Sequence, residues 1–189
     1  MATQPVARMT LEEYLANEDA AELPSEYLEG EVFPMEGASP NHARVLRNLI
    51  VALAPIATRG QGELLPTARV KIEATGLYTY PDILITCGEI RYLDSKKTTI
   101  LNPRIIFEVA SPATAKYDEG WKFWHYRQIP SLAEYILASQ DKPIMVYSKR
   151  LPDGKWLSTD LQGSGQTLHL ELLETELPIG RAYEGVQPV

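Results

Sequence analysis

Short apolar runs separated by turn-forming residues predict alternating strands and helices along most of this chain. Three runs are rich in β-branched and large apolar residues and predict strands at 64–74, 81–87 and 104–110. An aromatic-rich helix is expected at 116–129, and a fourth strand at 133–139. Because a strand, a helix and another strand in succession usually form a parallel crossover, the last two strands should pair in one sheet.

The segments before and after this core carry their own signals. Thr10 and Glu13 have capping-box spacing and predict a short helix. The run 25–35 alternates around Gly30 and predicts a β-hairpin. Ser39-Pro40 predicts the start of a helix that ends before Gly60. Three C-terminal runs predict strands that extend the sheet as a meander, at 143–149, 155–160 and 167–172.

The pattern predicts one domain over residues 1–189 and the α/β (α+β) class. Its expected core has the order αβββαβ, with a mixed central sheet flanked by helices and extended by the N-terminal hairpin and C-terminal strands. At 189 residues, 44% hydrophobic and 23% charged, the chain is long enough to bury a substantial core. No apolar run approaches the ~20 residues of a membrane span, so no membrane association is expected. The single cysteine, Cys87, is consistent with a reducing cytoplasm.

Two of the predicted strands carry an acid among apolar residues. Asp82 follows Tyr80-Pro81 at the start of one run, and Glu108 lies inside Phe107 to Pro112. A buried carboxylate needs a compensating cation or hydrogen bonds. Two such acids on adjacent strands would suit a shared Mg²⁺, which is usually held by one or two carboxylates together with waters and phosphate oxygens. The alternative is a pair of acids at strand ends, each solvated or paired in a salt bridge.

A lysine in the aromatic helix is the third candidate. Asp118 lies four residues before Lys122 and Tyr126 lies four residues after it, so the three side chains share one helix face. Lys122 can therefore point toward the acids. The alternative is an amphipathic lysine whose stem covers apolar surface while its ammonium reaches water.

These residues resemble the PD-(D/E)xK nuclease superfamily and, within it, the Uma-two group of restriction-endonuclease-like proteins. The resemblance runs over nearly the whole chain. It includes segments at 25–32, 39–42, 80–82, 108–114, 117–122, 129–135 and 183–186. Any one segment is a weak match, but their order and spacing together are fairly specific.

The resemblance implies an endonuclease that hydrolyses the phosphodiester bonds of DNA with Mg²⁺, or alternatively Mn²⁺. Asp82 and Glu108 would be the motif acids and would hold the metal together with the backbone carbonyl of Val109. Lys122 would be the catalytic lysine. The superfamily lysine normally stands two residues after the glutamate, where this chain has Ala110, so Lys122 would be a migrated lysine.

Three further residues are candidates for supporting roles. Glu26 could join the metal site, orient His42, or be a plain hairpin acid. His42 lies in the first turn of the helix after Ser39, where the helix dipole disfavours a protonated ring. A neutral ring is therefore expected, either at the site or bonded to backbone. Tyr126 shares the helix face of Lys122.

The charge of the chain supports a rival function. The net charge of −7 argues against broad binding to nucleic acid, which relies on lysine and arginine. Basic residues for a DNA track would have to come from Arg69, Lys71, Arg91 and Lys96-Lys97. The rival is a catalytically inactive, dimeric or partner-binding module with the nuclease fold. A homodimer is expected, because enzymes that cut both strands often pair their active sites, with Tyr147 and Trp156 as aromatic interface candidates.

Overall fold

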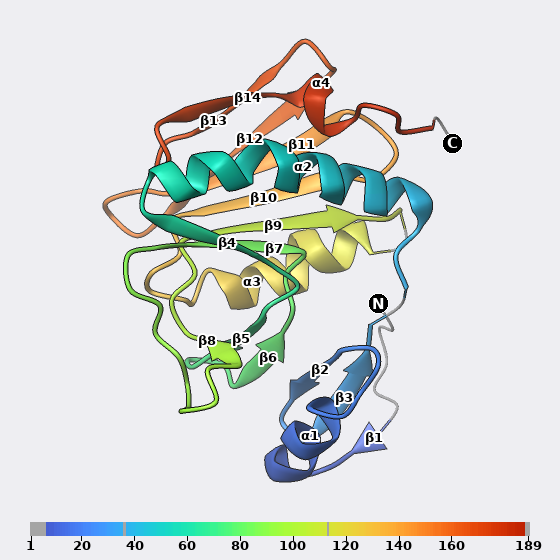
Figure 1. Ribbon diagram of the computed structural model, residues 1–189, viewed down its shortest axis with the longest axis vertical. Coiled ribbons are helices and arrows are strands. Elements are labelled where there is room, and N and C mark those ends of the chain that lie inside the picture. Colours follow the sequence, from blue (N-terminus) through green and yellow to red (C-terminus); the bar gives the residue numbers. More distant parts are fainter. Residues whose placement is uncertain (1–6, 36, 113, 188–189) are drawn as a thin grey trace.

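The computed structural model describes residues 7–35, 37–112 and 114–187, and its main body is built on a mixed six-stranded sheet (Figure 1). The strands of this central sheet follow the spatial order β12 (Trp156–Gln162), β11 (Ile144–Arg150), β10 (Glu134–Ser139), β9 (Ile105–Ala110), β7 (Ile83–Cys87) and β4 (Gly62–Pro66). The expected parallel crossover is confirmed, because β9 and β10 are parallel with Glu134 opposite Ile105. The other neighbouring pairs are antiparallel.

Helices cover both faces of the central sheet (Figure 1). On one face α2 (Pro40–Arg59) packs Leu49 and Leu53 against the side chains of β7 and β9. On the other face lie a π-helix, η1 (Tyr117–Lys122), and the short helix α3 (Phe123–Tyr126), which buries Tyr126. Since β9 is covered on both faces, all six of its residues are buried. None of the described helices is long and apolar enough to cross a membrane.

A second six-stranded sheet joins the N-terminal hairpin to the main body (Figure 1). Its order is β1 (Ala7–Arg8), β3 (Glu31–Pro34), β2 (Ser25–Leu28), β6 (Leu77–Thr79), β5 (Arg69–Ile72) and β8 (Thr99–Ile100). The junction is the pairing of Tyr27 on β2 with Tyr78 on β6. Both rings contact Tyr14 of α1 (Leu11–Glu18), so an aromatic cluster fixes the hairpin against the body.

The predicted local signals at the N-terminal elements are confirmed. Thr10 and Glu13 form the reciprocal capping box of α1. Glu29 and Gly30 take positive φ angles of 50° and 90° in the β2–β3 turn, the conformation that a tight hairpin requires. Ser39 caps α2, its side chain accepting from the backbone N–H of His42, and Pro40 occupies the first turn.

The single strand expected at 64–74 is wrong, because the chain changes sheets within it. β4 ends at Pro66, Thr67 takes a φ of 51°, and β5 begins at Arg69 in the second sheet. A positive φ is uncommon for threonine and turns the chain out of the extended conformation. The short strand β6, which pairs with β5, was not predicted.

The C-terminal strands follow the predicted meander only in part. β11 and β12 extend the central sheet, but β13 (Thr167–Leu170) leaves it and pairs with β14 (Thr175–Pro178), ahead of helix α4 (Ile179–Ala182). Leaving the sheet allows Leu168 and Leu170 to be buried in the α2 core. Tyr147, expected at an interface, is only 9% exposed and donates a hydrogen bond to Glu134.

The predicted helix at 116–129 is shorter and partly of π type. Its first turns form η1, α3 then ends at Tyr126, and a turn leads to Pro130. Proline disfavours helical geometry in the residue before it, so Pro130 keeps the helix from resuming after this turn. Single π turns are rare and are found frequently at functional sites.

Candidate active site

Asp82 and Glu108 face each other across two neighbouring strands. β7 and β9 are antiparallel with Ile83 opposite Phe107, so one further step in this register sets Asp82 opposite Glu108. The backbone N–H of Val109 donates a hydrogen bond of 2.7 Å to Oδ2 of Asp82, which extends the contact between the strands. Asp82 and Glu108 line one cleft, which agrees with the expectation of two acids on adjacent strands.

The cleft has a volume of about 430 Å³ and lies where four parts of the chain meet. Its walls come from the end of the hairpin, the start of α2, the ends of β7 and β9, and η1. The lining residues include Met35, Ser39, His42, Thr67, Asp118 and Lys122. A concave site with several convergent polar groups is the usual form of a ligand-binding site.

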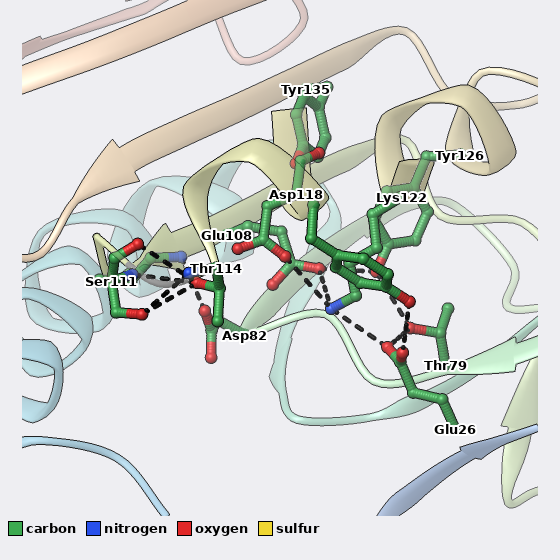
Figure 2. Close-up of polar contacts among 12 residues, drawn as sticks. Glu26, Thr79, Asp82, Glu108, Ser111, Thr114, Asp118, Lys122, Tyr126 and Tyr135 are labelled. Carbon is green, nitrogen blue, oxygen red and sulfur yellow. Dashed lines mark hydrogen bonds and ion pairs between the residues drawn. The ribbon is translucent and has the colours of Figure 1, made fainter. Parts of the chain in front are cut away.

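Lys122 enters this site from the last turn of η1 (Figure 2). Its ammonium donates a hydrogen bond of 2.9 Å to Oε1 of Glu108. It lies 3.2 Å from Oε1 of Glu26 and 4.0 Å from Oδ1 of Asp118. Because the residue is only 3% exposed, the interpretation of Lys122 as a surface lysine that reaches water is wrong.

Tyr126 lies on the same side as Lys122, as their spacing indicated. Its hydroxyl donates a hydrogen bond of 2.7 Å to Oε1 of Glu108, the oxygen that also accepts from Lys122. Two donors therefore hold one carboxylate oxygen in place, while Oε2 accepts none from the described residues. The second oxygen is left to face the cleft that Glu108 lines.

The electrostatics of the site depend on burial and on charge. Burial raises the pKa of Glu108 to about 8, against the attraction of Lys122, and the nearby charges of Asp82 and Asp118 add to the rise. Burial alone would lower the pKa of Lys122, but Glu108 and Glu26 outweigh it and raise that pKa well above its ordinary value. The site thus gathers three carboxyl groups, those of Glu26, Glu108 and Asp118, around one ammonium.

The donor set of the site fits a Mg²⁺ ion that completes its shell with other oxygens. Asp82 offers two oxygens that each accept one hydrogen bond, and Oε2 of Glu108 accepts none from the described residues. No group of three or more His, Cys, Asp or Glu side chains forms a ready metal site in the described part of the chain. Mg²⁺ needs no such group, since it commonly keeps several waters and uses only one or two carboxylates.

His42 reaches the site from the first turn of α2. Its Nε2 lies 3.1 Å from Oδ1 of Asp82, and both side chains are largely buried. Burial lowers the pKa of His42, but the hydrogen bond and the charge of Asp82 outweigh it, so that the pKa is raised overall. The charge of Asp82 thus acts on His42 in the opposite direction to the helix dipole.

Glu26 contacts Lys122 rather than His42. It reaches Lys122 from β2 and also accepts hydrogen bonds from Thr79 and Tyr117 (Figure 2). Thr79 and Tyr117 were not predicted as members of the site, and Asp118 was predicted on the helix face of Lys122 without being assigned to the site. Asp118 was detectable, because it precedes Lys122 by four residues, whereas nothing in the local pattern marks Thr79.

The basic residues considered for a DNA track are partly engaged elsewhere. Arg69 is buried and donates hydrogen bonds to Thr98 and Thr99, and its guanidinium lies 3.5 Å from Asp19. The ammonium of Lys96 is bonded to the same aspartate. These contacts attach α1 to the main body, so this cluster stabilises the fold.

The family model that matches residues 11–180 is Uma2, described as "Putative restriction endonuclease". The chain belongs to the Uma2 family. The chain is similar in sequence to the uncharacterised protein sll1609 of Synechocystis sp., with 33% identity over an alignment that covers 88% of this chain and 94% of that protein. The uncharacterised protein slr1290 of the same organism is 31% identical, and the alignment covers 96% of this chain and 95% of slr1290.

A solved structure confirms the fold class of this Uma2 protein. The crystal structure of "a putative nuclease belonging to DUF820" from Anabaena variabilis superimposes with a TM-score of 0.76. The match covers 95% of this chain and 99% of that one at 15% sequence identity. At this identity the likeness concerns the fold, which is the restriction-endonuclease-like architecture expected from the sequence.

Proposed function

We propose that this protein is a Mg²⁺-dependent endonuclease that hydrolyses phosphodiester bonds of DNA, with Mn²⁺ able to replace Mg²⁺. The observation that carries the proposal is the ammonium of Lys122 bonded to Glu108 in the cleft that Asp82 also lines. A lysine beside two strand acids is the arrangement that the superfamily resemblance implies. Membership of a family described as restriction endonucleases supports a nuclease.

The proposed roles follow from the positions of the side chains. Asp82, Glu108 and the carbonyl of Val109 would hold the metal, which would polarise the phosphate and lower the pKa of a water. Lys122 would donate a hydrogen bond to that water or to the charge that develops on the phosphate. Surrounded by carboxylates, its ammonium stays protonated, so a donor role fits better than that of a base. His42 and Tyr126 would orient Asp82 and Glu108.

The first experiment measures metal binding. Calorimetric titration with Mg²⁺ and with Mn²⁺ should detect a site in the wild type that Asp82→Ala abolishes. Asp153→Ala is the matched control, since Asp153 is an exposed acid in the turn before β12. Cleavage of supercoiled plasmid should need the divalent ion. It should be lost in Asp82→Ala and retained in the control variant. Equal metal binding by Asp82→Ala and the wild type would refute the proposed site.

The rival function is a partner-binding module without catalytic activity. The net charge of −7 and Ala110 at the usual lysine position favour it. Such a module has no need of a divalent ion in the cleft. It would be supported if the folded wild type bound neither Mg²⁺ nor Mn²⁺ and left plasmid and linear DNA intact.

A further inference from the structure

Glu26 is a fully buried carboxylate whose oxygens are both engaged. It has no exposed surface, and Oε1 accepts a hydrogen bond from Thr79 and lies 3.2 Å from Nζ of Lys122. Its Oε2 accepts a hydrogen bond of 3.1 Å from the hydroxyl of Tyr117. A buried charge is tolerated when it is paired and hydrogen-bonded in this way. Glu26 does not line the cleft, so its partners are these three residues rather than a ligand.

The ammonium of Lys122 has carboxylates on two sides (Figure 2). Glu108 accepts from it at 2.9 Å, and Glu26 lies at 3.2 Å. Lysine has three N–H donors, of which one bonds to Glu108, while Glu26 adds a second negative charge at ion-pair distance. Asp118 at 4.0 Å is beyond hydrogen-bond distance, which leaves a donor of the ammonium for the cleft that Lys122 lines.

The N-terminal hairpin holds Glu26 in a fixed place. The next residue, Tyr27, stacks on Tyr14 and pairs with Tyr78 of the main body. Further along the hairpin, Phe33 packs against Trp121, the neighbour of Lys122 in η1. The contacts of Tyr27, next to Glu26 on β2, and of Phe33, opposite Glu26 on β3, thus fix the backbone of the hairpin at Glu26.

We infer that Glu26 is a positioning residue, which the hairpin supplies so that the Lys122 ammonium keeps one N–H directed into the cleft. Without the charge of Glu26, the ammonium would be drawn toward Glu108 and Asp118 alone and would leave its present place. The N-terminal hairpin is then part of the active site as well as of the fold. The catalytic part of this inference rests on the proposed nuclease function, but the placement of Lys122 can be tested without it.

The first test observes the ammonium directly. In protein with ¹⁵N-labelled lysine, the Nζ signal of Lys122 is assigned by its loss in Lys122→Arg. Glu26→Gln should shift this signal or broaden it through faster proton exchange with water. Glu31→Gln should leave it unchanged, because Glu31 is an acid of the same hairpin whose partner is the exposed Arg8. An unchanged Lys122 signal in Glu26→Gln would overturn the inference whether or not the protein cleaves DNA.

The second test measures cleavage. Since a misplacement of about 1 Å can cost about 10²-fold in rate, Glu26→Gln should lower kcat by roughly that factor and leave KM and Mg²⁺ affinity nearly unchanged. Glu26→Asp, which keeps the charge on a shorter side chain, should recover part of the loss. A shifted Lys122 signal with wild-type kcat would overturn the catalytic part. A shifted signal in a protein that cleaves no DNA would refute the nuclease function and leave the placement of Lys122 standing.

A milder variant keeps both tests available if Glu26→Gln does not fold. Tyr117→Phe removes one hydrogen bond to Glu26 and retains the ring that stacks on Trp121. It should change the Lys122 signal and kcat in the same direction as Glu26→Gln, by a smaller amount. If circular dichroism shows a folded Tyr117→Phe protein with both quantities at wild-type values, the inference fails.

Discussion

The backbone N–H of Val109 donates a hydrogen bond of 2.7 Å to Oδ2 of Asp82, joining the end of β9 to the residue that precedes β7. This bond fixes an acid that lies outside the regular strand. Oδ1 of Asp82 is held from the other side by His42 at 3.1 Å. The carboxylate is therefore oriented before any ligand enters, which lowers the reorganisation that binding or catalysis requires.

Removing the lysine should affect both activity and stability. Lys122→Ala should reduce Mg²⁺-dependent DNA cleavage by about 10²–10⁴-fold if the ammonium acts on the reacting groups. It should also lower the free energy of unfolding by about 3–5 kcal/mol, because buried carboxylates lose their cation. Cleavage assays and urea denaturation measure the two effects, at a temperature where the variant is folded. Lys116→Ala, which removes an exposed lysine of the same segment, should change neither. Near-normal cleavage by a folded Lys122→Ala protein would exclude a catalytic lysine.

The hydroxyl of Tyr126 should matter more than that of another buried tyrosine. Tyr126→Phe removes a donor to the Glu108 carboxylate and should cost about 1–3 kcal/mol in the free energy of unfolding. Tyr135→Phe is the matched control, because that hydroxyl donates to the backbone carbonyl of Asp118, a neutral acceptor. Urea denaturation should show the larger loss of stability for Tyr126→Phe. The rate of DNA cleavage should also fall more in Tyr126→Phe than in Tyr135→Phe. Equal losses in the two variants would contradict a special role for the bond to Glu108.

The buried carboxyl group of Glu134, which does not line the cleft, should make the stability of the protein depend on pH. Burial raises the pKa of Glu134 above its ordinary value of 4.5, although Tyr147 and the backbone N–H groups of Glu171 and Leu172 oppose the rise. The folded protein then binds this proton more tightly than the unfolded chain does. Glu134 therefore makes its whole contribution to the free energy of unfolding below pH 4.5, and this contribution is lost as the pH rises through the pKa of the folded state.

Replacing this acid should remove its share of the pH dependence. Urea denaturation of Glu134→Gln and the wild type, compared upward from pH 4.5, should show the variant gaining stability relative to the wild type as the pH rises. Glu12→Gln, which alters an exposed carboxylate of α1, serves as the control. If the difference in stability between Glu134→Gln and the wild type stays constant with pH, the pKa of Glu134 is the same in the folded and unfolded states, and the prediction is wrong.

We expect a homodimer that forms through β12. This strand is an edge of the central sheet, most of its residues are exposed, and Leu157 is 48% exposed. An uncovered edge strand of this length can pair with a second copy. Light scattering at roughly tens of micromolar should give twice the mass of the chain. A proline in place of Thr159, at the middle of the strand, should return the protein to a monomer. A wild-type monomer at that concentration would refute the expectation.

Much of the site was predictable because its signals are local. Asp82 and Glu108 each interrupt an apolar run, and an acid in a buried strand requires a partner wherever the strand lies. The spacing of Lys122 and Tyr126 sets both on one helix face in any fold that keeps the helix. The caps at Thr10 and Ser39 depend only on their immediate neighbours, and both are confirmed.

Tertiary structure decided what depends on residues far apart in the chain. Nothing local indicates that Glu26 lies beside Thr79, 53 residues later, or that both belong with Lys122. Thr67 divides an apolar run between two sheets because each half pairs with a different strand. The sequence alone thus determined which residues need partners, since burying an unpaired charge is costly in any fold. Only packing determined which partners they have, because the pairing depends on how separate elements meet in space.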